Sequence, residues 1–279
     1  METIRISNTE IIAFLLVFFR TGAVLYTAPF LSSKSIPARV RILLSCAIAI
    51  VLVTALDIEG RHSTSLHEAA LIDGRNNILR LQQFMLQQGI IGLFMAIFRE
   101  VLLGIAIGYT AQLTFMGIQL AGQLMGHDMG FGMMRILDPT TQANVTIIAQ
   151  YNTVIATLIF VLINGHHFII MSLAKSFSSI PLAGWKPSAS FIGHVNTVFA
   201  SIFSTGLRVA IPIMGTLFLT KIGLAIVART MPQMNVFIVG FPLQISAGLI
   251  GMAVSLPIFV KVINTLFISM RDNIWVIVR

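Results

Sequence analysis

The sequence has few charged residues, and this shortage limits what kind of protein it can encode. Only 10% of its 279 residues are Asp, Glu, Lys or Arg, whereas a soluble globular domain has about 25%. Hydrophobic residues make up 56% of the chain, and the mean hydropathy is +0.91. These values exclude an ordinary soluble domain and predict an integral membrane protein.

Cysteine is almost absent, and motifs for catalysis are missing. The single thiol, Cys46, cannot form an intrachain disulfide and lies in an apolar run, where it packs as a small hydrophobe. The six histidines show no metal-binding spacing, and the adjacent His166 and His167 would diverge by about 100° on a helix. No nucleophile, phosphate-loop, dinucleotide or zinc-protease motif occurs. We therefore predict a protein that is not an enzyme and uses no cofactor or metal.

The net charge of +8 does not indicate a nucleic-acid partner. The 18 Lys and Arg are scattered singly, and no basic run or RNA-binding motif is present. We interpret the excess as anchoring at membrane surfaces and expect no nucleic acid among the partners.

Six apolar regions predict an all-α membrane protein, since about 20 apolar residues cross a bilayer as a helix. The regions are 11–31, 41–57, 90–126, 145–175, 191–220 and 236–270. The third would extend about 55 Å as a straight helix, against about 30 Å of hydrocarbon. We expect it to be broken or to project beyond the lipid.

The connectors are less regular. The charged stretch 58–89 is predicted to contain a short helix near 76–88, and residues 221–235 are expected to form a loop. The basic turn at 32–41 favours a cytoplasmic first connection and an external N-terminus, although the basic residues on the two sides nearly balance.

Three of the apolar regions carry a narrow polar stripe, which lipid alone would not favour. Offsets of 4, 7 and 11 residues stay within about 40° of one line on a helix. The stripes are Gln112, Met116, Gln119 and Gln123; then Thr146, Gln150, Thr153 and Thr157; then Thr197, Ser201, Ser204 and Arg208. Two interpretations stay open: the stripes hydrogen-bond to one another within a bundle, or they line a wet path or face polar partner subunits.

Small residues and isolated charges add two expectations about packing. The glycine pairs Gly104/Gly108 and Gly122/Gly126 have the four-residue spacing that lets helix backbones approach closely. Glu100 is the one carboxylate that lies well inside an apolar region. We expect it to form a buried ion pair with Arg20 or Arg208.

Several motifs together resemble the FliR/SctT family of type III protein export gates. They are FRTGAVLYTAPFLSSKSIPARVR at 19–41, REVLLGIAIGY at 99–109, AGQLMGHDMGFGMMRILDPTTQ at 121–142, INGHH at 163–167 and ARTMPQMNVFIVGFPLQI at 228–245. They occur in the family's order and cover nearly the whole chain.

The resemblance implies helical hairpins in two parts, a FliP-like part at 1–190 fused to a FliQ-like hairpin at 191–279. It also implies a heteromeric complex in the bacterial inner membrane, at the base of a flagellum or injectisome. The implied partners are FliP-like and FliQ-like subunits, FlhB-like and FlhA-like export proteins, unfolded export substrates and membrane lipid. Much of such a complex stands above the membrane plane, so the six regions could exceed the number of spans.

The resemblance also implies two functional segments. A loop at 126–142 would plug the pore: Gly126, Met129, Gly130, Phe131, Gly132, Met133, Met134, Asp138 and Pro139. Its glycines permit folding back, and its methionines supply adaptable apolar bulk. A hairpin tip would face the cytoplasm: Met231, Pro232, Gln233, Met234 and Asn235. Taken without the resemblance, residues 126–144 favour an ordinary reentrant turn.

The predicted function is a structural and gating subunit of an export channel, without enzymatic activity. The alternative is a self-contained six-helix transporter of small molecules or ions. That alternative requires a site between paired discontinuous helices, and the two halves of this sequence show no internal repeat.

Overall fold

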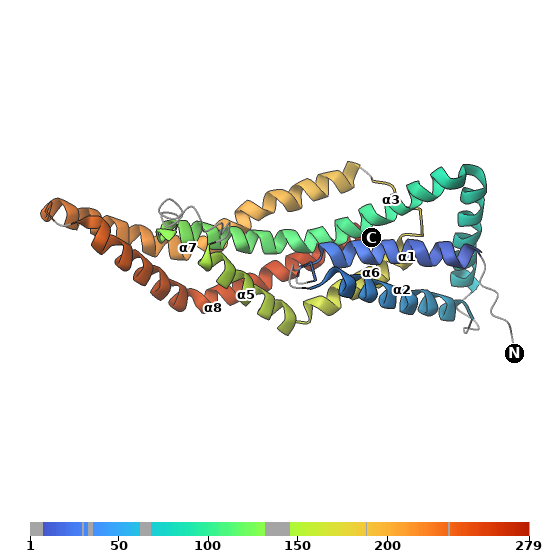
Figure 1. The fold of residues 1–279 in the computed structure, drawn as a ribbon, viewed down its shortest axis with the longest axis horizontal. Helices are drawn as coiled ribbons and strands as arrows, with labels where there is room; N and C mark the ends of the chain where they lie inside the picture. Colours follow the sequence, from blue (N-terminus) through green and yellow to red (C-terminus); the bar gives the residue numbers. More distant parts are fainter. Residues whose placement is uncertain are drawn as a thin grey trace. The chain divides into compact units, whose positions relative to one another are not determined.

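The computed structural model describes residues 8–29, 31–32, 36–61, 68–131, 146–187, 189–233 and 235–278, and all regular elements among them are helices (Figure 1). They are α1 (Asn8–Thr27), α2 (Ala38–Arg61), α3 (Glu68–Asp128), α5 (Ile147–Leu162), α6 (Gly165–Ser179), α7 (Ala189–Thr230) and α8 (Val236–Val278). The all-α prediction is confirmed.

Fewer helices can cross a membrane than the six apolar regions suggest. Among the described residues, three segments are long and apolar enough: Gly89–Asp128, Ala189–Thr230 and Ile238–Val278. A fourth results if α5 and α6, separated by a break, count as one span. The apolar part of α1, Ile11–Thr27, is shorter than a span requires. The prediction of a helical membrane protein is confirmed, with three to four spans.

A glycine breaks α3 before its apolar part begins. Gly89 has φ 53° and ψ −142°, a left-handed backbone that glycine adopts without steric cost. From Gly89 to Asp128 the helix continues for 40 residues, about 60 Å. The apolar region is therefore unbroken, and part of it must lie outside the hydrocarbon. The connector helix predicted at 76–88 is longer than expected, since α3 already begins at Glu68.

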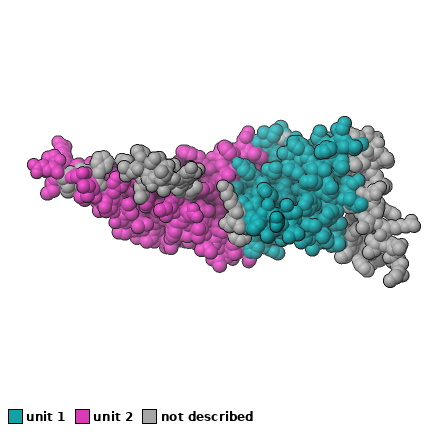
Figure 2. Space-filling model, viewed as in Figure 1, with its two compact units in different colours: residues 1–112, 166–193, 272–279 teal, residues 113–165, 194–271 magenta. Residues whose placement is uncertain are grey.

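The chain forms two compact units, coloured separately in Figure 2. Unit 1 comprises residues 1–112, 166–193 and 272–279, and unit 2 comprises residues 113–165 and 194–271. The predicted division near residue 190 concerns similarity to two different subunits rather than compactness. It stays a prediction.

In unit 1, the backbones of α1 and α3 lie in close contact. A Cβ added at Gly104 would lie 2.5 Å from the backbone oxygen of Arg20, and one added at Gly108 would lie 2.8 Å from that of Val24. Both glycines of the first predicted pair thus serve packing within the chain. At this contact Leu103 and Ile107 are fully buried.

A buried ion pair joins the same two helices. Arg20 Nε donates to Glu100 Oε2 at 2.5 Å, and the two side chains are fully buried. Arg20 also donates to the backbone oxygens of Ser176 and Ile180, while Glu100 Oε1 accepts from Ala183 N at 2.8 Å. The predicted pairing of Glu100 is confirmed, with Arg20 as its partner.

Three aromatic rings hold α3, α5 and α8 together in unit 2. The ring centroids of Phe115, Phe160 and Phe267 lie 5.4–5.5 Å from one another. These distances fall within the favourable range for aromatic pairs. Nearby, Gly122 packs directly on Ala149, so the second predicted glycine pair also serves contacts within the chain.

The two longest apolar helices, α7 and α8, form an antiparallel hairpin. α7 ends at Thr230 before Pro232, which cannot donate a helical hydrogen bond. A Cβ added at Gly251 of α8 would lie 2.8 Å from the hydroxyl oxygen of Thr216 of α7. The helical hairpin is therefore as predicted, but the expected loop at 221–235 is shorter, because α7 continues to Thr230.

Candidate functional site

The candidate site is the beginning of the 126–142 segment, where α3 ends. Met129 N donates to Met125 O and Gly130 N donates to His127 O, each at 3.0 Å, which closes the last turn of the helix. Gly130 has φ 94°, a conformation that L side chains rarely adopt. The backbone therefore leaves the helix direction at Gly130.

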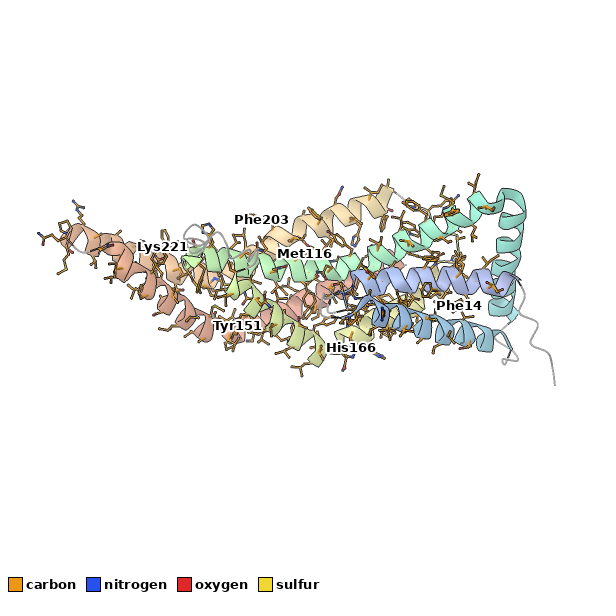
Figure 3. All side chains as sticks on the ribbon, viewed as in Figure 1. Phe14, Met116, Tyr151, His166, Phe203 and Lys221 are labelled. Carbon is orange, nitrogen blue, oxygen red and sulfur yellow. The ribbon has the colours of Figure 1, made fainter. Side chains whose placement is uncertain are left out.

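Both arms of the α7–α8 hairpin hold this helix end. Asp128 Oδ1 accepts a hydrogen bond from Lys221 Nζ of α7 at 2.8 Å, and both side chains are partly exposed. Lys221 is labelled in Figure 3. Met129 is fully buried, and a Cβ added at Gly248 of α8 would lie 2.7 Å from its Cγ. The start of the segment is thus fixed to α7 by charge and to α8 by packing.

The backbone at Gly130 also lies close to α8. A Cβ added there would lie 2.6 Å from Cε1 of Phe241 and 3.6 Å from Oε1 of Gln244. Glycine at this position therefore meets two requirements, a positive φ and a close approach to an aromatic ring. Any larger residue would be strained at this φ and would press against the Phe241 ring.

Thr146, the first described residue after the segment, lies beside the segment's near end. Thr146 caps α5 by accepting from Ala149 N at 3.2 Å, and its hydroxyl group donates to Gly122 O of α3 at 3.3 Å. A Cβ added at Gly126 would lie 2.7 Å from the Thr146 hydroxyl oxygen. The last turn of α3 and the start of α5 therefore lie against each other.

The predicted plug residues fall into two groups. Gly126, Met129, Gly130 and Phe131 are described: the first three pack as stated above, and Phe131 is half-buried. The others lie outside the described residues: Gly132, Met133, Met134, Asp138 and Pro139. The plug itself stays a prediction, and the structure shows the contacts with α7 and α8 at which the segment begins.

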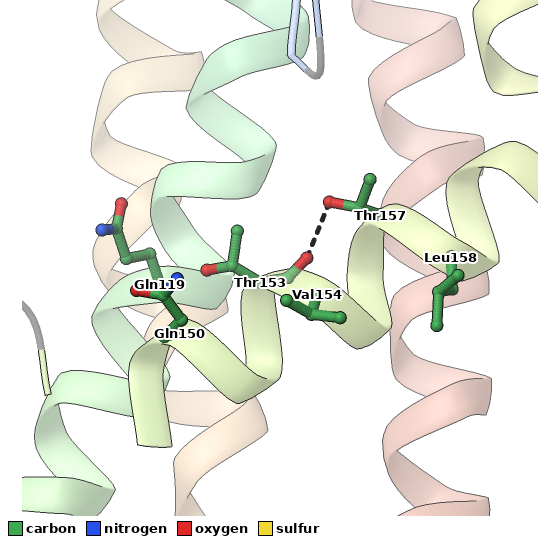
Figure 4. Close-up of a pocket in the computed structure, with 6 residues that line it drawn as sticks. All are labelled: Gln119, Gln150, Thr153, Val154, Thr157 and Leu158. Atoms are coloured by element: carbon green, nitrogen blue, oxygen red, sulfur yellow. Dashed lines mark hydrogen bonds between the residues drawn. The ribbon is translucent and has the colours of Figure 1, made fainter. Parts of the chain in front are cut away.

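Two of the polar stripes meet at an open groove of about 330 Å³ in unit 2 (Figure 4). Gln119 of α3 faces α5 across it. The lining residues are Gln119, Gln150, Thr153, Val154, Thr157 and Leu158. Within the described part of the chain the amides of Gln119 and Gln150 make no hydrogen bond, so the groove presents two polar groups that can each donate and accept.

The hydroxyl groups of the stripes bond mainly to their own helices. Thr153 donates to Ala149 O at 2.8 Å and Thr157 to Thr153 O at 2.7 Å. On α7, Ser201 donates to Val198 O and Ser204 to Ser201 O. Such bonds use the hydroxyl proton, so toward its surroundings each of these groups can only accept a hydrogen bond.

The remaining stripe residues lie apart from this groove. Gln112 Oε1 is buried without a hydrogen-bond partner among the described residues, and Gln123 is half-buried. Thr197, Ser201, Ser204 and Arg208 form an exposed row on α7. The structure therefore brings Gln119 of the first stripe against the second stripe and leaves the third stripe on the surface.

The predicted hairpin tip is an exposed turn between α7 and α8. Met231, Pro232, Gln233 and Asn235 are exposed, while Met234 lies outside the described residues. Ile238 N donates to Asn235 O at 3.0 Å, which begins α8. The tip thus presents uncharged polar and apolar groups outward.

The residues that seat the helix end were not predicted from the sequence. Lys221 was assigned to a loop, although a lone lysine between two apolar stretches could have signalled a buried or paired charge. Phe241, Gln244 and Gly248 are spaced three or four residues apart, so they share one face of α8. Nothing local connects that face with Gly130, more than 100 residues earlier.

Long apolar helices, a buried ion pair and a two-armed hairpin define a polytopic helical membrane protein. The model of the family described as bacterial export proteins, family 1, matches residues 11–270. The chain belongs to this family.

Curated relatives named flagellar biosynthetic protein FliR cover most of the chain. The one from Escherichia coli (strain K12) is 26% identical over 268 residues, 95% of this chain and 93% of the relative. The one from Bacillus subtilis (strain 168) is 30% identical over 258 residues, 91% of this chain and 90% of the relative. The one from Aquifex aeolicus (strain VF5) is 29% identical and covers 90% of this chain and 88% of the relative. The predicted membership of the FliR/SctT family is confirmed.

Proposed function

We propose that this chain is a structural and gating subunit of a flagellar-type protein export channel in the bacterial inner membrane. It provides a passage for unfolded substrates and performs no chemistry of its own. FliP-like and FliQ-like subunits complete the channel, and FlhB-like and FlhA-like proteins contact it. Its membership of an export family and its similarity to FliR proteins support this role.

The observation that carries the gating role is the double attachment of the 126–142 segment. Its first residues contact α7 and α8, and Thr146, four residues beyond its last one, lies against Gly126. A segment held between two such neighbouring points can move as a flap without disturbing the helices that carry it. Its glycines and methionines suit a seal that yields to varied passing chains.

The need for partner subunits follows from the length of the exposed apolar surface. Ile192 and Ile226 of α7 are 56% and 60% exposed, and as helical residues they lie about 50 Å apart along its axis. Hydrocarbon covers about 30 Å. Other proteins must cover the rest of this apolar surface.

The plug is tested by conductance of the assembled complex in planar bilayers. Deleting Gly130–Met134, or replacing Phe131, Met133 and Met134 by serine at unchanged loop length, is expected to raise the resting ion conductance at least tenfold. Met171→Ser is the matched control, because Met171 is exposed on α6 outside the segment. Conductance equal to wild type in both loop variants would show that the segment does not seal the channel.

A further inference from the structure

The α7–α8 hairpin contains one long charge-free stretch that ends at a lysine. No charged residue occurs from Val236 to Val260 of α8, and Lys261 follows directly. As a helix this stretch extends about 37 Å, which crosses about 30 Å of hydrocarbon with a modest tilt. Lys261 is therefore the first charged residue that α8 presents after a stretch long enough to cross the hydrocarbon.

A second cation lies at the same level on α7. Arg208 lines a narrow cavity together with Ser255, Ile258, Phe259 and Val262 of α8. These residues surround Lys261 in sequence, so Arg208 and Lys261 belong to one level of the hairpin. From this level to the tip, α7 contains two further cations, Lys221 and Arg229.

Neither Lys221 nor Arg229 leaves an unpaired charge within the apolar stretch. Lys221 binds Asp128 at 2.8 Å, and Arg229 lies beside the tip, in the last turn of α7. The hairpin between the level of Arg208 and the tip thus meets the requirements of a lipid-spanning segment. Its exposed side chains are mostly apolar on both arms, including Phe218 at 63% and Val254 at 75% exposure.

Arg208 and Lys261 themselves are exposed and unpaired. Within the described part of the chain neither side chain makes a hydrogen bond or an ion pair. Among the described residues of unit 2, Asp128 is the one acidic residue, and it already binds Lys221. Two cations at the edge of an apolar surface attract an anion from outside the chain.

We propose that Arg208 and Lys261 bind the phosphate of an anionic phospholipid and mark one membrane boundary of the hairpin. A lipid fits better than a carboxylate of a partner protein, because the cations end a stretch of membrane-spanning length whose exposed surface is mostly apolar on both helices. Arginine and lysine both bind phosphate oxygens by charge-assisted hydrogen bonds. This inference does not depend on the proposed export function.

Lipid retention tests the site directly. The complex is purified in nanodiscs of phosphatidylcholine and phosphatidylglycerol in a 3:1 ratio, and bound lipid is counted by native mass spectrometry. Arg208→Gln and Lys261→Gln are each expected to lower phosphatidylglycerol retention about fivefold, the effect of one cation near an anionic surface, while Arg208→Lys retains it. Lys186→Gln, which removes an exposed cation from the α6–α7 connector, is the matched control.

Three results would contradict the proposed lipid-binding site. Unchanged retention in both variants would show that these cations bind no lipid. An equal loss in Lys186→Gln would show unspecific attraction. Loss of a partner subunit from Arg208→Gln, without loss of lipid, would assign the arginine to a protein carboxylate.

Membrane depth gives a second, independent readout. In a Cys46→Ser background, nitroxide labels are placed at position 204, outside the cation level, and at position 223, where a Cβ would meet open space. Electron paramagnetic resonance is expected to show the label at 223 relaxed by oxygen and the label at 204 relaxed by a water-soluble reagent. The reverse order, or water contact at both positions, would contradict the boundary.

Discussion

At the residue scale, the pair of Arg20 and Glu100 shows how a membrane protein of this kind accommodates buried charge. The guanidinium group is satisfied by a carboxylate, by backbone oxygens near the end of α6 and by the ring of Phe177, 4.3 Å from its centroid. Removing one member leaves the other charged, buried and without its counter-ion, which costs far more than the pair contributes.

We therefore expect Arg20→Gln to destabilise the protein by about 3–5 kcal/mol and to lower its Tm in detergent on the order of 10 °C. Arg99→Gln is the control, because Arg99 is a neighbouring, half-buried cation with one bond to Ala183 O. It is expected to change Tm by a few degrees at most. The double variant Arg20→Met/Glu100→Leu, which removes both charges, is expected to recover most of the loss. Thermal unfolding that does not distinguish Arg20→Gln from Arg99→Gln would refute this account.

At the element scale, the hairpin of α7 and α8 provides the seat for the 126–142 segment. Packing of Met129 on Gly248 is buried and apolar, whereas the ion pair of Asp128 with Lys221 is partly exposed. Burial supplies most of the attachment, and the partly exposed ion pair supplies a smaller and reversible part.

Breaking the ion pair is expected to loosen the segment without unfolding the protein. Asp128→Asn or Lys221→Gln removes roughly 0.5–1 kcal/mol, so protease cleavage within 132–145 is expected to accelerate roughly two- to fivefold. The charge-swapped double variant Asp128→Lys/Lys221→Asp restores the attraction and is expected to return cleavage toward the wild-type rate. Equal cleavage rates in all four proteins would show that the pair does not hold the segment.

At the scale of the whole molecule, the long helices govern how the protein must be surrounded. α7 and α8 have 42 and 43 residues, about twice the length that hydrocarbon covers. Lipid can shield one part of each helix, and partner proteins must shield the remainder of the exposed apolar surface.

Purification in mild detergent is accordingly expected to yield this chain in a stable heteromeric complex with FliP-like and FliQ-like proteins. Mass spectrometry of the intact complex identifies the partners. The self-contained transporter makes the opposite prediction, a well-behaved monomer that moves a solute across vesicle membranes. Such a monomer would remove the export channel as the function of this chain.

The predictions that succeeded depend on neighbours along the chain. Hydropathy over about 20 residues predicted the membrane class, and the family resemblance, carried by short motifs, implied the hairpin of α7 and α8. The four-residue spacing of Gly104 and Gly108 predicted a close helix contact. Helix periodicity is a local property, so the sequence suffices to read it.

Other features required the tertiary structure. The sequence by itself determined that Glu100 needs a cation and that the polar stripes share helix faces; the fold decided that Arg20 is the cation and that Gln119 meets Gln150. It also decided that Asp128 meets Lys221, 93 positions later. Hydropathy and periodicity report which face of a helix is apolar, but not which other helix lies against it. That choice depends on how all the helices pack together, and no local window contains it.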